Sequence, residues 1–527
     1  MTRYTKTQFG KKARRSLLKG AREVYRAVST TLGPRGRNVV INKDFQVLVL
    51  HDGVKVARHI EPKNKFENAG ANILKEAAEK HVNAVGDGTT LTIVLAYQLM
   101  KEASVLVESG VNPMALRFAL EKGRDVIIGE IERLAKPIKN EKDKIDVATI
   151  SSADLKLGEM IGKTLHKIGL DGVLVAEETK SYETALEHEE GTRIDKGYIS
   201  PYFATDPRDM TATVQEARIL ITDREITDIY EILPFIEEQM KPNKVRNFVI
   251  IAPDVKGNAL ASFIETKMKG GMNLLCVKAP SFGNLQKEML QDLAIMTGGT
   301  FMANDHGKMF KDYTFDDLGF AKIVKSSEYT TTIMGLGGDP KKIKDRISFI
   351  KKQMEDPDTE FDREKLKERI AKMTGGVYVI KVGGSTEIEM TERKERVDDA
   401  ILATQSAIKG GIVPGGEVTF LTAIKKLKPT NQNEEYAYRI ISSALSKPFE
   451  KLLSNAGLNS GYYLAKLEDK SFGWGVDVTT EKLEDMVAKG IIDPALVLTE
   501  ALRSAMSVAI MVITGDVGII LEDEPKK

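Results

Sequence analysis

The stretch NFVIIAPDVKGNALASFIETKMKGGMNLLCV (247–277) decides the fold class of the middle of this chain. Its two ends, residues 247–252 and 273–277, are short apolar runs rich in residues that favour strands. Between them, residues 257–269 read as a helix. A strand, a helix and a second strand in succession predict a βαβ unit, so we expect an α/β domain over roughly residues 190–375.

Both flanks of this region have helical character instead. Phe66, Ala69 and Ile73 keep one apolar face at helical spacing, and residues 502–513 carry a similar stripe near the other end of the chain. Gly191 and Gly376 lie at the two ends of the α/β region. They could be hinges, because glycine is the least costly residue at a hinge, or they could be ordinary turn glycines. The economical architecture is a multidomain α protein with an inserted α/β domain.

Composition excludes several classes of protein. The 527 residues are 42% hydrophobic and 29% charged, which argues against global disorder. With 77 Lys and Arg against 76 Asp and Glu, the net charge of +1 argues against nucleic-acid binding. The single cysteine, Cys276, excludes a disulfide framework and a cysteine-cluster metal site. The sequence has no run of 18 apolar residues and no secretory signal pattern, so we expect no membrane insertion and a cytoplasmic location.

A glycine-rich motif, Gly86-Asp87-Gly88-Thr89-Thr90, opens an apolar helical run and is the first candidate site. Glycines let a backbone approach a ligand closely, and a helix N-terminus offers free N–H groups to an anion. The carboxylate could hold Mg²⁺ and the two hydroxyls could bind phosphate oxygens. A plain helix cap after an Asp-Gly turn is the alternative.

Further candidates are spread along the chain. The loop at 31–37 has glycines, a proline and two arginines, and is either an anion site or a helix end with solvated cations. A Gly-rich turn lies at 412–416. Asp52 and Asp399 are acids that could position a water molecule for phosphoryl transfer. The alternative is that each is an ordinary acid of a turn or of a helix surface. The sequence contains no GxxxxGK[ST] motif, no zinc-ligand histidine spacing and no Ser-His-Asp hydrolase spacing.

Together these segments resemble the group I chaperonins, the GroEL family, from about Phe9 to Pro494. The motifs that carry the resemblance, in the family's order, are TLGPRGRNVV (31–40), DGVKVAR (52–58), KFENAGA (65–71), GDGTT (86–90), DKGYISPYF (195–203), KAPSFG (278–283), MLQDLAIMTGGT (289–300), DREKLKERIAKMTGGVYVIKVGG (362–384), ERVDDAI (395–401), VPGG (413–416) and GIIDP (490–494).

The resemblance implies a GroEL-like chaperonin fold with three domains. They are a helical equatorial ATP-binding domain (1–133 and 409–527), a small intermediate hinge domain (134–189 and 376–408) and an α/β apical domain (190–375). The implied cofactors are ATP and Mg²⁺, with K⁺ as a further cation. The implied partners are non-native polypeptides, a GroES-like co-chaperonin and further copies of the chain in a heptameric ring, single or double.

The resemblance also assigns roles by position. Asp52 and Asp399 would be the catalytic acids that orient the attacking water, and Asp87 the magnesium ligand. Gly191 and Gly376 would be the hinges. The further ATP-binding positions would be Thr31, Leu32, Gly33, Pro34, His51, Gly88, Thr89, Thr90, Leu91, Gly416, Asp477 and Asp493.

An apolar groove between two apical helices would capture substrate. Its expected residues are Leu233 and Ile236 on the first helix, Leu260 and Ile264 on the second, and Tyr198, Tyr202 and Phe203 nearby. An exposed apolar groove would bind non-native chains through the apolar surface that they expose. The alternative is that these residues are core faces of amphipathic helices.

Several positions depart from the family pattern. Glu265 replaces an apolar groove residue, His51 a lysine, Leu91 a threonine, Asp477 an asparagine and Glu417 a glycine. The residues that usually make ring-to-ring contacts also differ, at Glu450, Asn459 and Tyr462.

The acids at 52, 87 and 399 are retained, so we expect an ATP-hydrolysing chaperonin that captures non-native polypeptides and promotes their folding in an enclosed cavity. The alternative is a chaperonin-fold binding scaffold with weakened or lost ATPase cycling.

Overall fold

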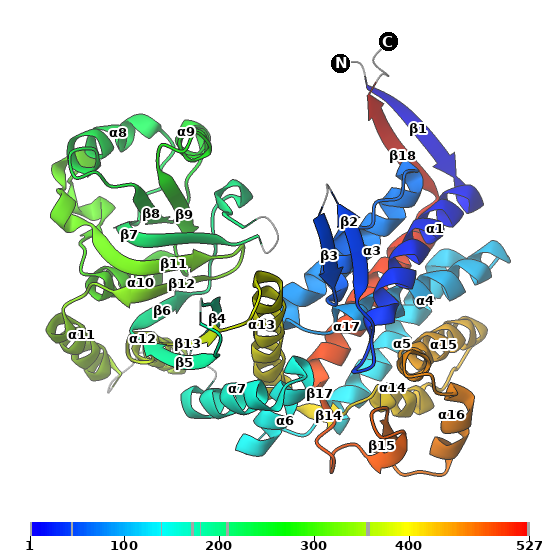
Figure 1. The fold of residues 1–527 in the computed structure, drawn as a ribbon. Coiled ribbons are helices and arrows are strands. Elements are labelled where there is room, and N and C mark those ends of the chain that lie inside the picture. Colours follow the sequence, from blue (N-terminus) through cyan, green and yellow to red (C-terminus); the bar gives the residue numbers. More distant parts are fainter. Residues whose placement is uncertain are drawn as a thin grey trace. The chain divides into compact units, whose positions relative to one another are not determined.

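A computed structural model describes residues 3–43, 46–138, 140–169, 173–179, 181–206, 210–354 and 359–523. The chain divides into two compact units. Unit 1 comprises Met1–Lys167 and Glu387–Lys527, and unit 2 comprises Ile168–Thr386 (Figure 1). The expected insertion of one unit into the other is therefore present. The finer three-domain boundaries stay a prediction.

Unit 1 is a helical assembly built around two long apolar helices, α4 (Thr89–Glu108) and α17 (Ala495–Thr514), which pack against each other. Both are long and apolar enough to cross a membrane by length and composition, but 72% and 67% of their most apolar windows are buried. Around them lie α1 (Gly10–Val28), α2 (Gly53–Arg58), α3 (Lys65–Val85), α5 (Pro113–Leu134), α6 (Glu141–Ser152), α7 (Leu155–Ile168), α13 (Glu387–Gly410), α14 (Val418–Ala423), α15 (Gln432–Asn455) and α16 (Ser460–Glu468).

Short antiparallel ribbons complete unit 1. They are β1 (Arg3–Phe9) with β18 (Val517–Asp523), β2 (Val39–Lys43) with β3 (Gln46–Leu50), β14 (Ile412–Pro414) with β17 (Ile492–Pro494), and β15 (Trp474–Asp477) with β16 (Lys482–Asp485). The β14–β17 pair joins two segments that are about 80 residues apart in sequence. It therefore fixes the Gly-rich turn after Pro414 beside Asp493.

Helix boundaries in unit 1 follow local sequence signals. Asn112 caps α5, its side chain accepting hydrogen bonds from the backbone N–H groups of Met114 (2.9 Å) and Ala115 (3.3 Å). Pro113 occupies the first turn, where its missing N–H costs nothing.

Unit 2 is an α/β unit around a mixed sheet, with strand order β6-β12-β11-β7-β8-β9 and β10 alongside β7 (Figure 1). The strands are β6 (Gly191–Ile194), β7 (Ala212–Thr222), β8 (Asn247–Ala252), β9 (Asn273–Lys278), β10 (Phe301–Met302), β11 (Gly319–Ser326) and β12 (Thr331–Leu336). β8 and β9 run parallel and α9 (Gly257–Met268) connects them, so the predicted βαβ unit is confirmed.

A second sheet of unit 2 brings together segments from both ends of that unit. β13 (Val377–Val382) pairs in parallel with β4 (Val173–Glu178) and antiparallel with β5 (Ala185–Glu189). The remaining long helices are α10 (Gly283–Thr297), α11 (Pro340–Gln353) and α12 (Glu360–Thr374). Cys276 is buried in β9, as expected for a small core residue.

Candidate functional site

The turn between α3 and α4 is built from glycines for steric reasons. Gly86 and Gly88 have φ values of +84° and +89°, which L side chains rarely adopt. A Cβ at Gly86 would lie 2.1 Å from the Cβ of Leu402, and one at Gly88 would lie 2.5 Å from Cγ1 of Val497. This packing fixes Asp87 at the N-terminus of α4, where free backbone N–H groups favour an anion.

Several groups hold Asp87 in place. Its Oδ2 accepts a hydrogen bond from Ser151 Oγ (3.0 Å), and its Oδ1 accepts one from the Gly88 N–H (2.5 Å). His81 Nε2 lies 2.6 Å from the Asp87 carbonyl oxygen. Burial lowers the pKa of His81 to about 4, so at neutral pH this ring is uncharged and donates through Nε2. Burial raises the pKa of Asp87, because its carboxylate loses hydration.

The loop at 31–34 lies against the same turn. The Thr31 and Thr90 hydroxyl oxygens are 3.2 Å apart, which joins the two loops directly. The side-chain amide of Asn455, at the end of α15, donates to the carbonyls of Ser29 (3.0 Å) and Leu32 (2.9 Å). Gly33 has φ +84° and packs so closely on Leu452 that a Cβ would come within 2.1 Å of it. Together these contacts fix the loop, including Pro34.

Asp52 reaches the same place from α2. Its carboxylate caps that helix by accepting a hydrogen bond from the Lys55 N–H (2.8 Å). The next residue, Gly53, touches the start of α4, because a Cβ there would lie 2.5 Å from Thr90 Oγ1 and 3.0 Å from Thr89 Oγ1. The absence of a side chain at position 53 therefore brings Asp52 beside the α4 turn.

The third acid, Asp399, comes from α13. Burial raises its pKa well above the usual value, and the negative charges of Asp52 and Asp87 raise it further, while Lys55 opposes them. Lys55 forms an ion pair with Glu395 of α13, and Ser406 Oγ donates to the Val85 carbonyl at 2.9 Å. These contacts fix α13 beside the α3–α4 turn. Three acids that are distant in sequence thus lie in one electrostatically coupled group.

The Gly-rich turn after β14 forms another side of this group. In the β14–β17 ribbon, Val413 is paired with Asp493. Burial, and then the charge of Asp87, raise the pKa of Asp493 to about 7, although the Gly416 N–H donates to it and lowers the pKa. Glu417 follows with its side chain buried, and burial and the charge of Asp493 raise its pKa well above the usual value.

The side chains of three expected ATP-binding positions make contacts within the chain, and the part of these positions in nucleotide binding stays a prediction. Leu91 is 5% exposed and packs in the core of unit 1, so its side chain belongs to the fold. Asp477 accepts hydrogen bonds from the Thr479 N–H (2.9 Å) and the Thr480 hydroxyl (2.9 Å), so its carboxylate caps its own turn. His51 Nδ1 lies 3.1 Å from Asn38 Oδ1. Burial, then the charge of Arg396, lowers the pKa of His51.

Sequence reasoning did not find Ser151, Asn455 or His81. Each supports the site from a helix. Ser151 and Asn455 act on loops that are remote in sequence, and His81 acts on the turn that follows its own helix. None belongs to a local motif with a chemical meaning. The signal for them exists in the tertiary structure alone.

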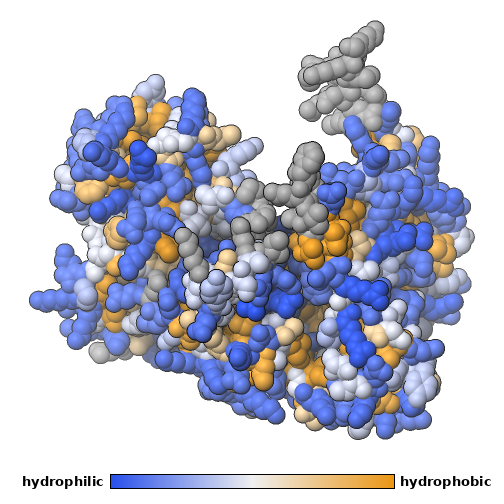
Figure 2. Space-filling model, in the orientation of Figure 1, coloured by the Kyte–Doolittle hydropathy of each residue, from blue (hydrophilic) through white to orange (hydrophobic). Residues whose placement is uncertain are grey.

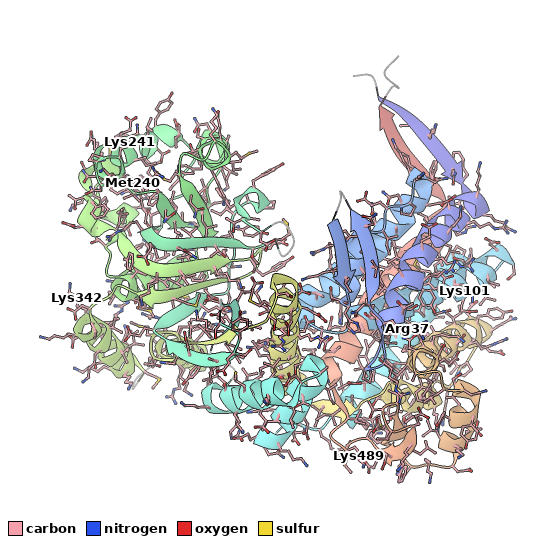
Figure 3. The ribbon with its side chains drawn as sticks, viewed as in Figure 1. Arg37, Lys101, Met240, Lys241, Lys342 and Lys489 are labelled. Carbon is pink, nitrogen blue, oxygen red and sulfur yellow. The ribbon has the colours of Figure 1, made fainter. Side chains whose placement is uncertain are left out.

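The expected groove in unit 2 is a surface where α9 lies near α8 (Leu233–Phe235) and the π-helical turn η4 (Ile236–Met240). Figure 2 shows hydrophobic atoms gathered where these elements lie in Figure 1. Met240 and Lys241, labelled in Figure 3, mark the end of η4. The partly exposed apolar side chains are Leu233, Ile236, Leu260 and Ile264, and the more exposed ones include Tyr202, Tyr230 and Met268.

Two of the expected groove residues are placed differently. Phe203 is fully buried and presents no apolar surface to a partner, whereas Tyr198 is 8% exposed and presents little. The Tyr198 hydroxyl donates to the Met210 carbonyl at 3.2 Å. Both residues pack in the core of unit 2. The turn η2 (Pro201–Phe203) directs Phe203 inward and exposes Tyr202. The exposed Glu265 forms an ion pair with Lys269 on α9.

The hinge candidates lie at strand starts. Gly376 has φ +62° directly before β13, which explains the need for glycine there. Gly191 begins β6 and packs on Val377, where a Cβ would lie 2.5 Å from Cγ2. Their role as hinges stays a prediction.

Replacing Glu417 with glutamine is expected to reduce the pH dependence of stability. A carboxyl whose pKa is raised on folding stabilises the folded chain fully below its unfolded pKa of about 4. That contribution is lost as the pH rises through the folded pKa, which is about 7 for Asp493 and well above 4.5 for Glu417. The wild-type melting temperature should therefore fall from pH 5 to pH 8.

The melting temperature of the variant should fall less over that range, because glutamine does not ionise. Each tenfold gain in proton affinity that folding gives to a carboxyl is worth about 1.4 kcal/mol. Thermal unfolding scans at several pH values measure this difference. Equal slopes for the two proteins would contradict the prediction.

Comparisons with known proteins agree with the fold. A family model described as the TCP-1/cpn60 chaperonin family matches residues 24–234 and 235–523. Two crystal forms of the chaperonin gp146 from the bacteriophage EL 2 (Pseudomonas aeruginosa), in the presence of ATP-BeFx, are similar in structure. Their TM-scores are 0.71 and 0.63, each at 21% sequence identity, covering 98% of this chain and 99% of that one. At this identity the structural likeness establishes the fold.

Proposed function

The chain belongs to the TCP-1/cpn60 chaperonin family, and from that premise we propose that it is an ATP-hydrolysing ring chaperonin of the group I type. It would capture non-native polypeptides on the apolar groove of unit 2 and promote their folding in an enclosed cavity. The proposal includes a heptameric ring, single or double, a GroES-like co-chaperonin and a cytoplasmic location.

The observation that carries the proposal is the convergence of Asp52, Asp87 and Asp399 at the N-terminus of α4. Phosphoryl transfer to water needs a phosphate cradle, a metal and a carboxylate that places the water. The α4 N-terminus and the Thr31 and Thr90 hydroxyls supply donors for phosphate oxygens. A structural ion-pair network would contain cations that balance its carboxylates. The charges that act on Asp399 come instead from three carboxylates, those of Asp52, Asp87 and Asp398, and from one cation, Lys55.

The residues fit a magnesium ion. Within the described ranges, no group of three or more His, Cys, Asp or Glu side chains is arranged to hold a metal by itself. Mg²⁺ characteristically takes one or two carboxylates and completes its shell with phosphate oxygens and water. Asp87 offers carboxylate oxygens at the N-terminus of α4, which suits that role. When bound, the ion would neutralise charge on the phosphate groups.

Asp52 and Asp399 would then act on the water. Each carboxylate would accept a hydrogen bond from the attacking water and orient it toward the terminal phosphorus. Lys55 connects their two elements, because its N–H bonds Asp52 and its ammonium group pairs with Glu395 on the helix of Asp399. The spacing between the two acids would therefore depend on how α13 packs against α2.

The test is the release of phosphate from ATP by the purified protein with Mg²⁺ and K⁺, on a sample whose mass is known from light scattering. We expect turnover from a particle of seven or fourteen chains, and loss of turnover when a chelator removes Mg²⁺. A large ring without turnover would favour a binding scaffold that does not cycle. A monomer without turnover would contradict the proposed function.

A further inference from the structure

A groove on the surface of unit 1 lies outside the candidate site described above. It forms where α1 and α4 pack together and has a volume of about 740 Å³. Five of the nine side chains that line it are cationic, and none of the nine is acidic. They are Arg15, Leu18, Lys19, Arg22, Tyr25, Arg26, Tyr97, Gln98 and Lys101. Ligand pockets commonly have volumes of about 300–1,000 Å³, so the groove is large enough for one small organic anion.

The cations that α1 contributes form one stripe along the helix: Arg15, Lys19, Arg22 and Arg26. Their spacing of three or four residues places them on one face. The first forms an ion pair with Glu108 (Nη2 to Oε2, 2.7 Å) and the second with Glu67 (Nζ to Oε1, 2.8 Å). Arg22 and Arg26 are exposed and form no ion pair within the part of the chain that the structure describes. Two like charges one turn apart repel each other, so an anion bound between them would stabilise the pair.

A buried amide lines the same groove from α4. Gln98 is 6% exposed, and its Oε1 atom is buried without a hydrogen-bond partner among the described residues. A buried polar atom without a partner is costly to the folded chain, because it has lost the hydrogen bond that it made with water. A ligand with an N–H or O–H donor would satisfy this atom. Gln98 therefore indicates a ligand that carries a hydrogen-bond donor as well as negative charge.

Two stacked tyrosines complete the groove. The ring centroids of Tyr25 and Tyr97 are 4.4 Å apart, and the ring planes differ by 18°. Tyr97 is 8% exposed, whereas Tyr25 is half-buried and leaves more of its surface open. Burial raises the pKa of Tyr97 and the charge of Arg22 lowers it, which places that guanidinium group near the rings. Aromatic rings beside cations suit a ligand that combines a flat ring with phosphate groups.

The groove is separate from the proposed ATP site. Gln98 and Lys101 lie nine and twelve residues beyond Thr89, the start of α4, which is roughly 14 and 18 Å along the helix axis. Lys101, labelled in Figure 3, belongs to the C-terminal half of this helix. None of the side chains that line the groove belongs to the loops or the acids at the α4 N-terminus.

We propose that this groove is a second nucleotide site, which binds a free nucleoside polyphosphate without Mg²⁺. Arg22 and Arg26 bind the phosphates and neutralise their charge in place of a metal. Gln98 Oε1 accepts a hydrogen bond from the base or the ribose, and the base stacks on Tyr25. A bare inorganic polyphosphate would leave Gln98 unpaired. The inference does not depend on the proposed ATP hydrolysis.

The experiment measures dissociation constants by calorimetry for ATP, for inorganic tripolyphosphate and for a short oligoadenylate. The protein is the assembled particle, after a chelating resin has removed Mg²⁺, on which the proposed ATP site depends. Wild-type protein should bind ATP under these conditions. In the double variant Arg22→Gln and Arg26→Gln this affinity should fall at least about tenfold, because two charge-assisted contacts are lost. Both arginines are exposed, so the variant should fold.

The double variant Lys11→Gln and Lys12→Gln is the matched control. Both lysines are exposed on α1 and neither lines the groove, so the control removes the same charge from the same helix. Its affinity for Mg²⁺-free ATP should equal that of the wild type.

Gln98→Leu tests the contact with the base or the ribose. It removes the unpaired acceptor and keeps a side chain of similar size, so ATP should bind about fivefold more weakly. The affinity for tripolyphosphate should not change, because that ligand has no donor for Gln98.

The outcomes separate this inference from the proposed function. The inference is wrong if the wild type does not bind Mg²⁺-free ATP, if the two double variants lose affinity equally, or if Gln98→Leu has no effect. Tighter binding of the oligoadenylate than of ATP would also overturn it, since the ligand would then be a nucleic acid. So would dissociation of the particle in the arginine variant, measured by light scattering, since the groove would then be a contact between copies. Absence of ATP turnover with Mg²⁺ would overturn the proposed function alone.

Discussion

Asp399→Ala is expected to reduce ATP hydrolysis by at least about 100-fold and to leave nucleotide binding intact. Asp399 lies on α13 near the charges of Asp52 and Asp87, and in the proposed function its carboxylate would be the acceptor that α13 brings to the attacking water. The phosphate cradle at the α4 N-terminus and the proposed metal ligand Asp87 do not depend on it.

Asp398→Ala is the matched control for this substitution. Asp398 is adjacent on the same helix, and its Oδ2 lies 3.8 Å from Lys394 Nζ. Its loss removes the same number of atoms from α13. We expect turnover within about threefold of the wild type. Single-turnover phosphate release, together with calorimetric binding of ADP, measures both quantities. Near-normal turnover in Asp399→Ala, or equal losses in both variants, would contradict the assignment.

The order of elements could be predicted from the sequence because their signals are local. The run at 247–277 indicated a strand, a helix and a strand, and the structure has β8, α9 and β9 there. Asn112 and Pro113 marked the start of α5 for the same reason, since a cap and a first-turn proline act within one helical turn.

Side-chain roles were less predictable because they depend on tertiary packing. Leu91 follows the two threonines of the α4 turn, yet one residue further along the helix the side chain points into the core. Phe203 and Tyr202 are neighbours with similar character, but a single 3₁₀ turn buries one and exposes the other. Asp477 accepts a hydrogen bond within its own turn, a contact that the sequence did not indicate.

In the candidate site, too, the residues could be predicted from local motifs, whereas the contacts that bring them together could not. The acids at 52, 87 and 399 could be named from their motifs, but their convergence requires Gly53 to touch α4 and Ser406 to hold α13 against the α3–α4 turn. Those contacts join segments separated by tens to hundreds of residues. No local pattern encodes them, and a resemblance to a family supplied what periodicity could not.

The second large effect is expected in the groove of unit 2. The double substitution Leu260→Ser and Ile264→Ser should abolish capture of an unfolded client while ATP turnover persists. The two side chains lie one turn apart on α9 and are partly exposed. Burying each against a client would contribute roughly 1.5–3 kcal/mol, so losing both should weaken binding by more than about 100-fold.

Thr266→Ser is the matched control, because residue 266 is exposed on the same helix and lies three or four residues from neither 260 nor 264, so it does not share their face. Glu265→Val tests the opposite direction. It replaces an exposed charge that pairs with Lys269 by an apolar side chain beside Ile264, so capture should become tighter.

Co-sedimentation of a chemically unfolded client with the particle measures all three proteins. Because Leu260 and Ile264 also pack on the core of unit 2, circular dichroism must first show that the double variant is folded. Capture that survives in a folded double variant would place the client-binding surface elsewhere.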